Sequence, residues 1–288
     1  MSHTTRFISA GLLFAILWAS ASVAGKFGLQ SAEPLTLFTI RFLLAGAILL
    51  GYVAIAGKWQ LPSKKEWLQI SIFGAFNTTL YLGIFIIALG DVAAGITALM
   101  IALNPLLISV LSAILMRRPV AVREWISIVL GMAGVSIATY PLLEDGYATV
   151  AGVVLLAISM LTYSIGAVYY ASVKWTLSRS VINGWQVLIG GLLLLPFTLI
   201  FEGGGTVYDT GFWLSVAWLI IPVSIGAVQL WLYLLKEDAV KASLWLFVCP
   251  VFGLLYSTWL LGEPFTVYTA AGAAIVLVSL YIGQRVNQ

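Results

Sequence analysis

The stretch GITALMIALNPLLISVLSAILMRRP, residues 95–119, is almost wholly apolar for twenty-two residues, yet it carries Pro105 in its middle. A proline inside a helix removes a hydrogen bond and usually kinks or breaks the helix. The pattern recurs 145 residues later in KASLWLFVCPVFGLLYSTWLLGEP, residues 241–264, where Pro250 falls opposite Pro105. Apolar runs of this length predict membrane-spanning helices. Their repetition predicts a chain built from two related halves.

The composition supports a membrane protein. Of the 288 residues, 61% are hydrophobic and only 9% are charged, whereas a soluble domain carries about 25% charged residues. Alternating segments of the β-barrel kind are missing from the sequence, so the predicted class is an all-α integral membrane protein. The single cysteine, Cys249, and the single histidine, His3, leave almost no ligands for a metal or haem. We therefore expect no metal and no other cofactor.

Apolar runs between polar or turn-forming breaks predict ten helices, approximately 7–25, 35–56, 67–89, 94–116, 121–140, 148–172, 182–201, 211–235, 239–261 and 266–284. With the N-terminus inside, 12 of the 14 lysines and arginines fall in cytoplasmic segments, and only Lys26 and Arg41 lie toward the outer side. This predicts a multi-pass protein of the cell inner (plasma) membrane with both termini in the cytoplasm.

The first helix also permits another reading. Arg6, an apolar run and the tripeptide Ala19-Ser20-Ala21 imitate a cleavable signal peptide. Helix 1, however, has a partner in helix 6 at the same offset of 145, and its removal would leave that partner unmatched. We therefore expect the helix to be retained.

The offset of 145 defines two halves. It brings Trp18 opposite Tyr163 and Asn77 opposite Pro222, and it runs without a gap from helices 1 and 6 to helices 4 and 9. The predicted domains are residues 1–143 and 144–288, each with five helices. Because five is odd, the second half enters the membrane from the opposite face. Inverted repeats of this kind are typical of secondary transporters, whose substrate sites lie near the midplane.

Pro105 and Pro250 are interpreted as the breaks in two helices that bend around one central cavity. Irregular backbone is tolerated at membrane depth only where protein or water surrounds it. A kink that neighbouring helices satisfy is the alternative explanation for either proline alone.

Several segments resemble a known family. Residues 88–115, ALGDVAAGITALMIALNPLLISVLSAIL, and residues 234–282 resemble the second halves of two EamA domains, and FTIRFLLAGAILL (38–50) and WASASVAGKFG (18–28) resemble parts of the first domain. The chain is therefore similar, from about residue 10 to 284, to the ten-helix drug/metabolite transporter superfamily. Within it, the chain looks most similar to bacterial amino-acid exporters of the YddG type. The resemblance implies a central cavity between helices 1, 3, 4, 6, 8 and 9.

Choosing one face of each such helix gives a predicted substrate-binding lining, whose members are aromatic, amide-bearing or small: Trp18, Asn77, Tyr81, Thr97, Met100, Asn104, Tyr163, Gln229, Tyr233, Trp245 and Cys249. A lining without ionised groups suits a neutral or zwitterionic solute with an apolar side chain. The alternative is that these aromatic residues simply fill the bundle or its interfacial belts.

Charged residues refine the hypothesis. Lys26 and Arg41 are predicted to attract a carboxylate at an outer vestibule; the alternative is that they reach the headgroups or pair with Glu33. All eleven acidic residues fall in breaks or at helix ends. Proton-coupled transporters use a membrane-embedded carboxylate or histidine, so a facilitator or exchanger without proton coupling is favoured.

The sequence thus predicts an exporter of small metabolites, foremost neutral or aromatic amino acids, that works by alternating access. Gly166 and Gly226 are candidate hinges. The alternative is an exchanger of sugar phosphates, nucleotide sugars or other drug-like metabolites. An enzyme is disfavoured because no catalytic cluster is present, and a channel because no re-entrant loop is visible. The expected partners are a small-molecule substrate and the lipid bilayer, without nucleic acid, for a monomer or homodimer.

Overall fold

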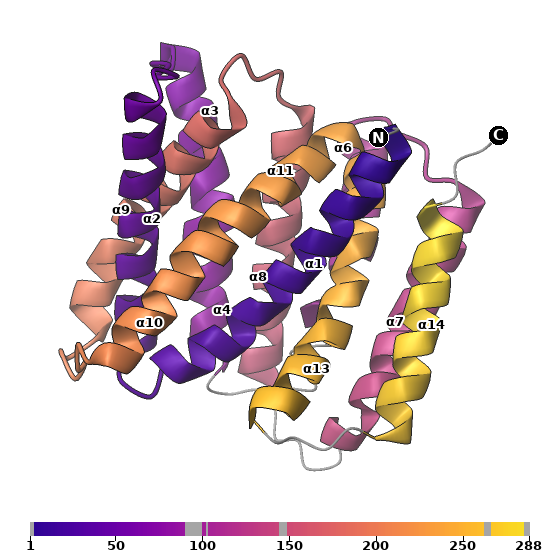
Figure 1. Cartoon of the computed structure of the whole chain (residues 1–288). Helices are drawn as coiled ribbons and strands as arrows, with labels where there is room; N and C mark the ends of the chain where they lie inside the picture. The colour runs from indigo at the N-terminus through magenta and orange to yellow at the C-terminus, as the bar shows by residue number, and fades with distance from the viewer. Residues whose placement is uncertain (1–2, 90–99, 102, 144–148, 262–265, 285–288) are drawn as a thin grey trace.

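The computed structural model describes residues 3–89, 100–101, 103–143, 149–261 and 266–284 (Figure 1). Every regular element among those residues is a helix, which confirms the all-α class. The elements are α1 (His3–Gly28), α2 (Pro34–Ile55), α3 (Lys64–Gly74), η1 (Ala75–Leu80), α4 (Tyr81–Leu89), α6 (Asn104–Leu115), α7 (Val122–Leu143), α8 (Val150–Ser172), α9 (Arg179–Phe201), α10 (Thr210–Trp218), η2 (Leu219–Ala227), α11 (Val228–Glu237), α12 (Ala239–Ser243), η3 (Leu244–Phe247), α13 (Val248–Leu261) and α14 (Val267–Gln284).

Eight stretches of the described residues are long and apolar enough to cross a bilayer, as a multi-pass membrane protein requires. They are His3–Gly28, Pro34–Ile55, Lys64–Phe85, Val150–Ser172, Arg179–Phe201, Thr210–Glu237, Ala239–Leu260 and Val267–Gln284. α6 and α7 occupy the places of the fourth and fifth predicted helices. Residues 90–99 of the fourth lie outside the described residues, and the count of ten stays a prediction.

Polar residues begin the helices where the apolar runs begin. The side chains of Ser63, Ser178, Asp209 and Asp238 each accept a hydrogen bond from a backbone N–H in the first turn that follows. Such caps satisfy donors that have no partner within the helix. Each cap therefore fixes the residue at which a helix starts.

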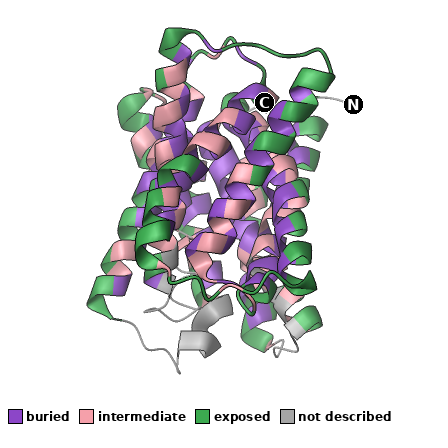
Figure 2. Cartoon of the chain, turned by 90° about the vertical axis from the view of Figure 1, so that its left-hand side faces the viewer, coloured by how far each residue is buried: buried purple, intermediate pink, exposed green. Residues whose placement is uncertain are grey.

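The outside of the bundle is apolar. Ile55 and Trp259 are each 90% exposed, and other large apolar side chains are exposed on the outer faces of most helices. Figure 2 shows the exposed residues around the periphery and the buried residues between the helices. Because apolar surface of this extent is unfavourable in water, it is the surface that faces lipid.

The offset of 145 recurs in the backbone geometry. It carries the π-helix η1 (Ala75–Leu80) onto residues 220–225, which lie inside the second π-helix, η2. It also carries the start of α6 at Asn104 to within one residue of the start of α13 at Val248. π-Helices are rare and occur frequently at functional sites. Matching irregularities in both halves support the predicted repeat, whose inverted orientation stays a prediction.

Two pairs of helices flank the bundle, α2 with α9 on one side and α7 with α14 on the other (Figure 1). In each pair the two helices approach closely at a glycine. A Cβ at Gly46 would lie 2.6 Å from Leu188 Cβ, and one at Gly134 would lie 2.9 Å from Gly272 O. Small residues allow membrane helices to approach closely. Gly134 and Gly272 therefore serve packing within one chain.

The two termini of the described chain meet at one end of the bundle. His3 of α1 and Gln284 of α14 line the same surface hollow, together with Asp238 and Lys241. We call this the inner end, after the predicted orientation, and the opposite end the outer end. Termini on one side are what an even number of crossings requires.

Candidate functional site

The centre of the bundle holds five aromatic rings, which we call the aromatic group: Phe14, Trp18, Tyr81, Tyr163 and Trp231. Tyr163 is their hub, with ring centroids 4.7 Å from Tyr81, 5.9 Å from Trp231 and 6.4 Å from Trp18. Phe14 stacks on Trp231 at 5.0 Å. The rings come from α1, α4, α8 and α11, two elements from each predicted half. Trp18 and Tyr163, paired by the offset, therefore lie together, and the sequence reasoning missed Phe14 and Trp231.

Three polar atoms in this region are buried without a hydrogen-bond partner among the described residues: Tyr163 Oη, Trp231 Nε1 and Trp245 Nε1. Trp245 lies against α1, so close that a Cβ at Gly11 would be 2.0 Å from its ring. Leaving buried polar groups unpaired is unfavourable, and each such group calls for an explanation. A polar solute that binds between α1, α8, α11 and η3 would supply the missing partners.

Asn104 begins α6 beside the first helix break. It is 1% exposed, its Nδ2 donates to Met160 Sδ at 3.2 Å, and the Ser164 hydroxyl donates to its Oδ1 at 3.2 Å. Pro105 lies in the first turn of α6, where a proline costs no hydrogen bond. Asn104 thus connects the break to α8, the helix that carries Tyr163.

The second break has a similar form. The 3₁₀ segment η3 gives way to α13 at Val248, so Pro250 also stands in a first turn. Cys249 beside it is buried, and its thiol donates to Trp245 O at 3.7 Å. Met100 is partly buried and packs against the small cluster of Ala88 and Leu156. Thr97, the remaining predicted residue on helix 4, lies outside the described residues.

A buried chain of polar side chains joins α2, α9 and both π-helices. Gln186 accepts from Thr78 at 2.9 Å and from Asn77 Nδ2 at 3.4 Å, and it donates to Asn183 at 3.0 Å. Asn183 donates to the backbone oxygen of Ser224 at 2.9 Å. We call these residues, with Arg41, the polar network: Arg41, Asn77, Thr78, Asn183, Gln186 and Ser224. Two amides three residues apart in apolar α9 were the sequence signal for Asn183 and Gln186.

Gln229 and Tyr233 do not join the aromatic group. The Gln229 amide donates to Arg179 O at 3.4 Å, and the Arg179 guanidinium lies 5.1 Å above the Tyr233 ring. Arg179 begins α9 at the inner end of the bundle. The structure therefore places both residues toward the inner end, away from the aromatic group.

The two candidate hinge glycines make close contacts. A Cβ at Gly166 would lie 3.3 Å from the backbone nitrogen of Asn77, and one at Gly226 would lie 3.4 Å from Ile221 O. Gly166 thus lets α8 approach η1. Helix packing accounts for the contacts of Gly166, and the hinge role of both glycines stays a prediction.

Lys26 and Arg41 differ in their surroundings. Lys26 is exposed near the end of α1, whereas Arg41 is only 5% exposed and its Nε donates to Ser224 Oγ at 2.9 Å. Glu33, the suggested partner, instead accepts from the backbone nitrogens of Gly203–Gly205 at 3.0–3.1 Å. Arg41 therefore neither reaches the headgroups nor pairs with Glu33, and it is more enclosed than an open vestibule implies.

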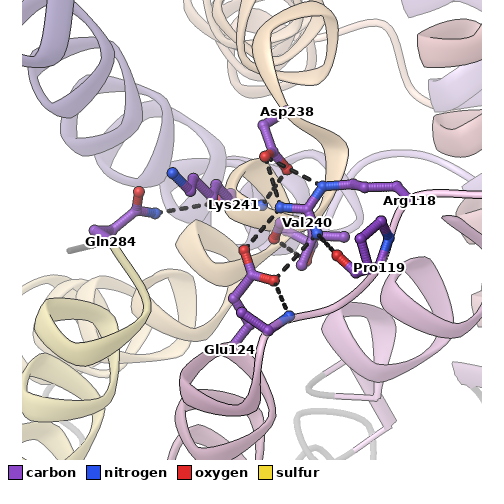
Figure 3. Close-up of polar contacts among 9 residues, drawn as sticks. Arg118, Pro119, Glu124, Asp238, Val240, Lys241 and Gln284 are labelled. Carbon is purple, nitrogen blue, oxygen red and sulfur yellow. Dashed lines mark hydrogen bonds and ion pairs between the residues drawn. The ribbon is translucent and has the colours of Figure 1, made fainter. Parts of the chain in front are cut away.

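Acidic groups lie at the ends of the bundle. At the inner end Arg118 bridges Glu124 Oε1 at 2.7 Å and Asp238 Oδ2 at 2.6 Å (Figure 3). Burial alone would lower the pKa of Arg118, but the hydrogen bonds to both carboxylates raise it above its ordinary value. The described residues contain no group of three His, Cys, Asp or Glu side chains suited to a metal ion.

Comparison with known proteins places these features in a family. The profile of the EamA-like transporter family matches residues 5–140 and 150–283. The chain is 29% identical to the inner membrane transporter YedA of Escherichia coli K12, over 94% of this chain and 90% of YedA. It is 26% identical to a transporter of Archaeoglobus fulgidus, over 93% of this chain and 95% of that protein.

A solved crystal structure has the same fold. It matches with a TM-score of 0.82 and 20% sequence identity, and the match covers 96% of this chain and 97% of the other. At this identity the likeness concerns the fold alone.

Proposed function

This chain belongs to the EamA-like transporter family, and we propose that it is a carrier that exports small metabolites, foremost neutral or aromatic amino acids. It works by alternating access around a solute site at the centre of the bundle. The relatives named above are transporters, YedA an inner membrane one. We accordingly propose the cell inner membrane as its location, with both termini in the cytoplasm.

The aromatic group is the observation that carries this proposal. Its rings offer stacking surfaces to an apolar side chain, and the unpaired atoms Tyr163 Oη and Trp231 Nε1 offer hydrogen bonds. Binding sites for small molecules combine predominantly apolar walls with a few convergent polar groups. A neutral or zwitterionic amino acid matches that combination. All five rings come from one chain, so a monomer is sufficient for the site.

The distribution of acids supports a facilitator. Glu66 and Glu124 are the buried acids among the described residues, and both stand in the first turn of a helix at the inner end. Glu124 is held by Arg118, and Glu66 accepts from the Thr176 hydroxyl. Neither contacts the aromatic group, so no buried carboxylate of the described residues is placed for a proton relay through the centre.

Counterflow into liposomes tests the proposal. Purified protein is reconstituted with unlabelled amino acid inside, and uptake of the labelled amino acid is measured with and without a pH gradient. We expect saturable uptake that a pH gradient does not change. Uptake that depends on the gradient would contradict the facilitator, and uptake without saturation would indicate a channel.

Substitutions locate the site in the same assay. Trp18→Ala and Asn104→Ala should lower the flux, because they remove a ring of the aromatic group and the amide beside it. Trp259→Ala is the matched control, since Trp259 is 90% exposed toward lipid. Unchanged flux in Trp18→Ala and Asn104→Ala, at normal expression, would refute the lining.

The alternative, an exchanger of sugar phosphates, nucleotide sugars or other drug-like metabolites, has the burial of Arg41 in its favour. A phosphate monoester carries close to two negative charges at neutral pH, and one arginine would leave it partly uncompensated in an apolar interior. Liposomes loaded with glucose 6-phosphate distinguish the two candidates, since we expect no phosphate exchange.

A further inference from the structure

Arg41 carries a charge into the interior of the bundle. Its Cζ lies 5.3 Å from the Phe38 ring and 5.1 Å from the Phe42 ring, and its Nε donates a hydrogen bond to Ser224 Oγ. Among the described residues, no carboxylate lies within ion-pair distance of Arg41. A buried charge without a counter-charge is costly, and charged groups inside membrane bundles are by default functional.

The acids beside the start of α2 are already engaged. Both carboxylate oxygens of Glu33 accept backbone N–H groups of Gly203–Gly205. Glu202 accepts from the backbone nitrogens of Leu35 and Thr36, each at 2.6 Å. These two carboxylates fasten the outer ends of α2 and α9 together. Neither neutralises Arg41.

Arg41 is connected to the aromatic group through the polar network. Ser224 links it to Asn183, Gln186 and η1 through the polar network. η1 leads directly into α4, whose first residue is Tyr81, and the Tyr81 ring lies 4.7 Å from that of Tyr163. Hydrogen-bonded side chains thus join the guanidinium to the predicted solute site, from the side of α2 and η2.

We propose that Arg41 binds the carboxylate of the transported solute, so that this carrier selects solutes with a carboxylate. This inference rests on the proposed function and adds the group by which the solute is recognised. A guanidinium presents a fork of donors that matches a carboxylate with two hydrogen bonds. A single carboxylate would also neutralise Arg41, the one buried cation among the described residues, whereas a dianion would leave a net charge. The ammonium group of an amino acid would meet the faces of the aromatic rings.

Selectivity of the unaltered protein is the first test. Counterflow is measured with labelled leucine and phenylalanine, with their carboxamides, and with the acids lactate and benzoate. We expect flux for compounds with a free carboxylate and at least roughly tenfold less for the carboxamides, since a buried charge would lose its partner. Comparable flux of acids and amides would overturn the role of Arg41 but leave a transporter of amino acids standing.

The other outcomes separate the two proposals. Flux of lactate or benzoate without flux of amino acids would refute amino acids as the solute and support the carboxylate site. Flux of none of these acids would overturn both. Flux of glucose 6-phosphate alone would contradict the carboxylate and favour an organic phosphate.

Variants then assign the selectivity to Arg41. Arg41→Gln should lower the flux of acids by at least roughly tenfold and abolish the preference for acids over amides. Arg41→Lys should keep the preference with a weaker flux, since lysine retains the charge but not the fork. Arg6→Gln, which neutralises an exposed arginine at the inner end of α1, is the control. A preference retained in a folded Arg41→Gln protein would refute the proposal, and if that variant does not fold, the Arg41→Lys protein and the unaltered protein still decide.

Discussion

Tyr163→Phe is expected to stabilise the protein while it impairs transport. The Tyr163 side chain is 2% exposed, and its hydroxyl has no hydrogen-bond partner among the described residues. An unpaired buried hydroxyl costs about 1–3 kcal/mol. Removal of this hydroxyl should therefore raise the free energy of unfolding by about 1 kcal/mol, or the melting temperature by about 2 °C.

The matched variant is Tyr256→Phe. Tyr256 is partly buried, and its hydroxyl donates to Ile16 O at 3.2 Å. Loss of a made hydrogen bond should lower stability by about 1 kcal/mol. Two identical chemical changes are thus predicted to shift the melting temperature in opposite directions, which the intrinsic fluorescence of detergent-solubilised protein can measure during heating.

Transport supplies the second readout. If Tyr163 Oη binds the solute, Tyr163→Phe should reduce counterflow about tenfold, the cost of one hydrogen bond to a polar ligand. Tyr256→Phe should leave counterflow close to that of the unaltered protein. A Tyr163→Phe protein that melts lower, as Tyr256→Phe should, or that transports normally would refute the reasoning.

Three further predictions follow from packing, charge and topology. Arg118→Gln should lower the free energy of unfolding by about 2 kcal/mol, because Glu124 stays buried after losing its counter-charge. Thermal melting measures this loss, and Arg117→Gln, at the exposed neighbouring residue, is the control. Gly190→Ala should cost about 1–3 kcal/mol, because its Cβ would lie 2.5 Å from Thr78 Cβ, whereas Gly25→Ala meets no atom within 4 Å and should melt normally. In a Cys249→Ser background, Lys58→Cys and Gly203→Cys should react with impermeant thiol reagents from the cytoplasmic and outer sides respectively; labelling of both from one side would contradict the orientation.

The helices were predictable because apolar length and polar breaks are properties of the sequence. The predicted segment 182–201 differs by three residues from α9 at its start, where Ser178 caps the helix. The prediction of Trp18 beside Tyr163 also rested on sequence, since the offset of 145 pairs them directly.

The π-helices were not predictable. A π-helix holds more residues per turn than an α-helix. Each residue that η2 adds in this way rotates the side chains of the following helix by about 100° relative to an uninterrupted α-helix. The stripe of Gln229 and Tyr233, chosen on an α-helical period, is therefore displaced from the centre and meets Arg179. The burial of Arg41 could not be predicted for another reason. Its hydrogen-bond partner Ser224 lies 183 residues away in the sequence.

The two flanking pairs restrict how the molecule can change shape. Each pair joins a helix of the first half to its counterpart in the second, with backbones in contact at Gly46 and Gly134. The two halves are thus packed together along both edges of the bundle. This packing opposes a rigid-body motion that would separate the halves. We expect the solute site to open to alternate sides through bending of the central helices at η1, at η2 and at the breaks before Pro105 and Pro250. A covalent bridge between α2 and α9 should then leave counterflow intact. Loss of counterflow in the bridged protein would show that α2 and α9 must separate during transport.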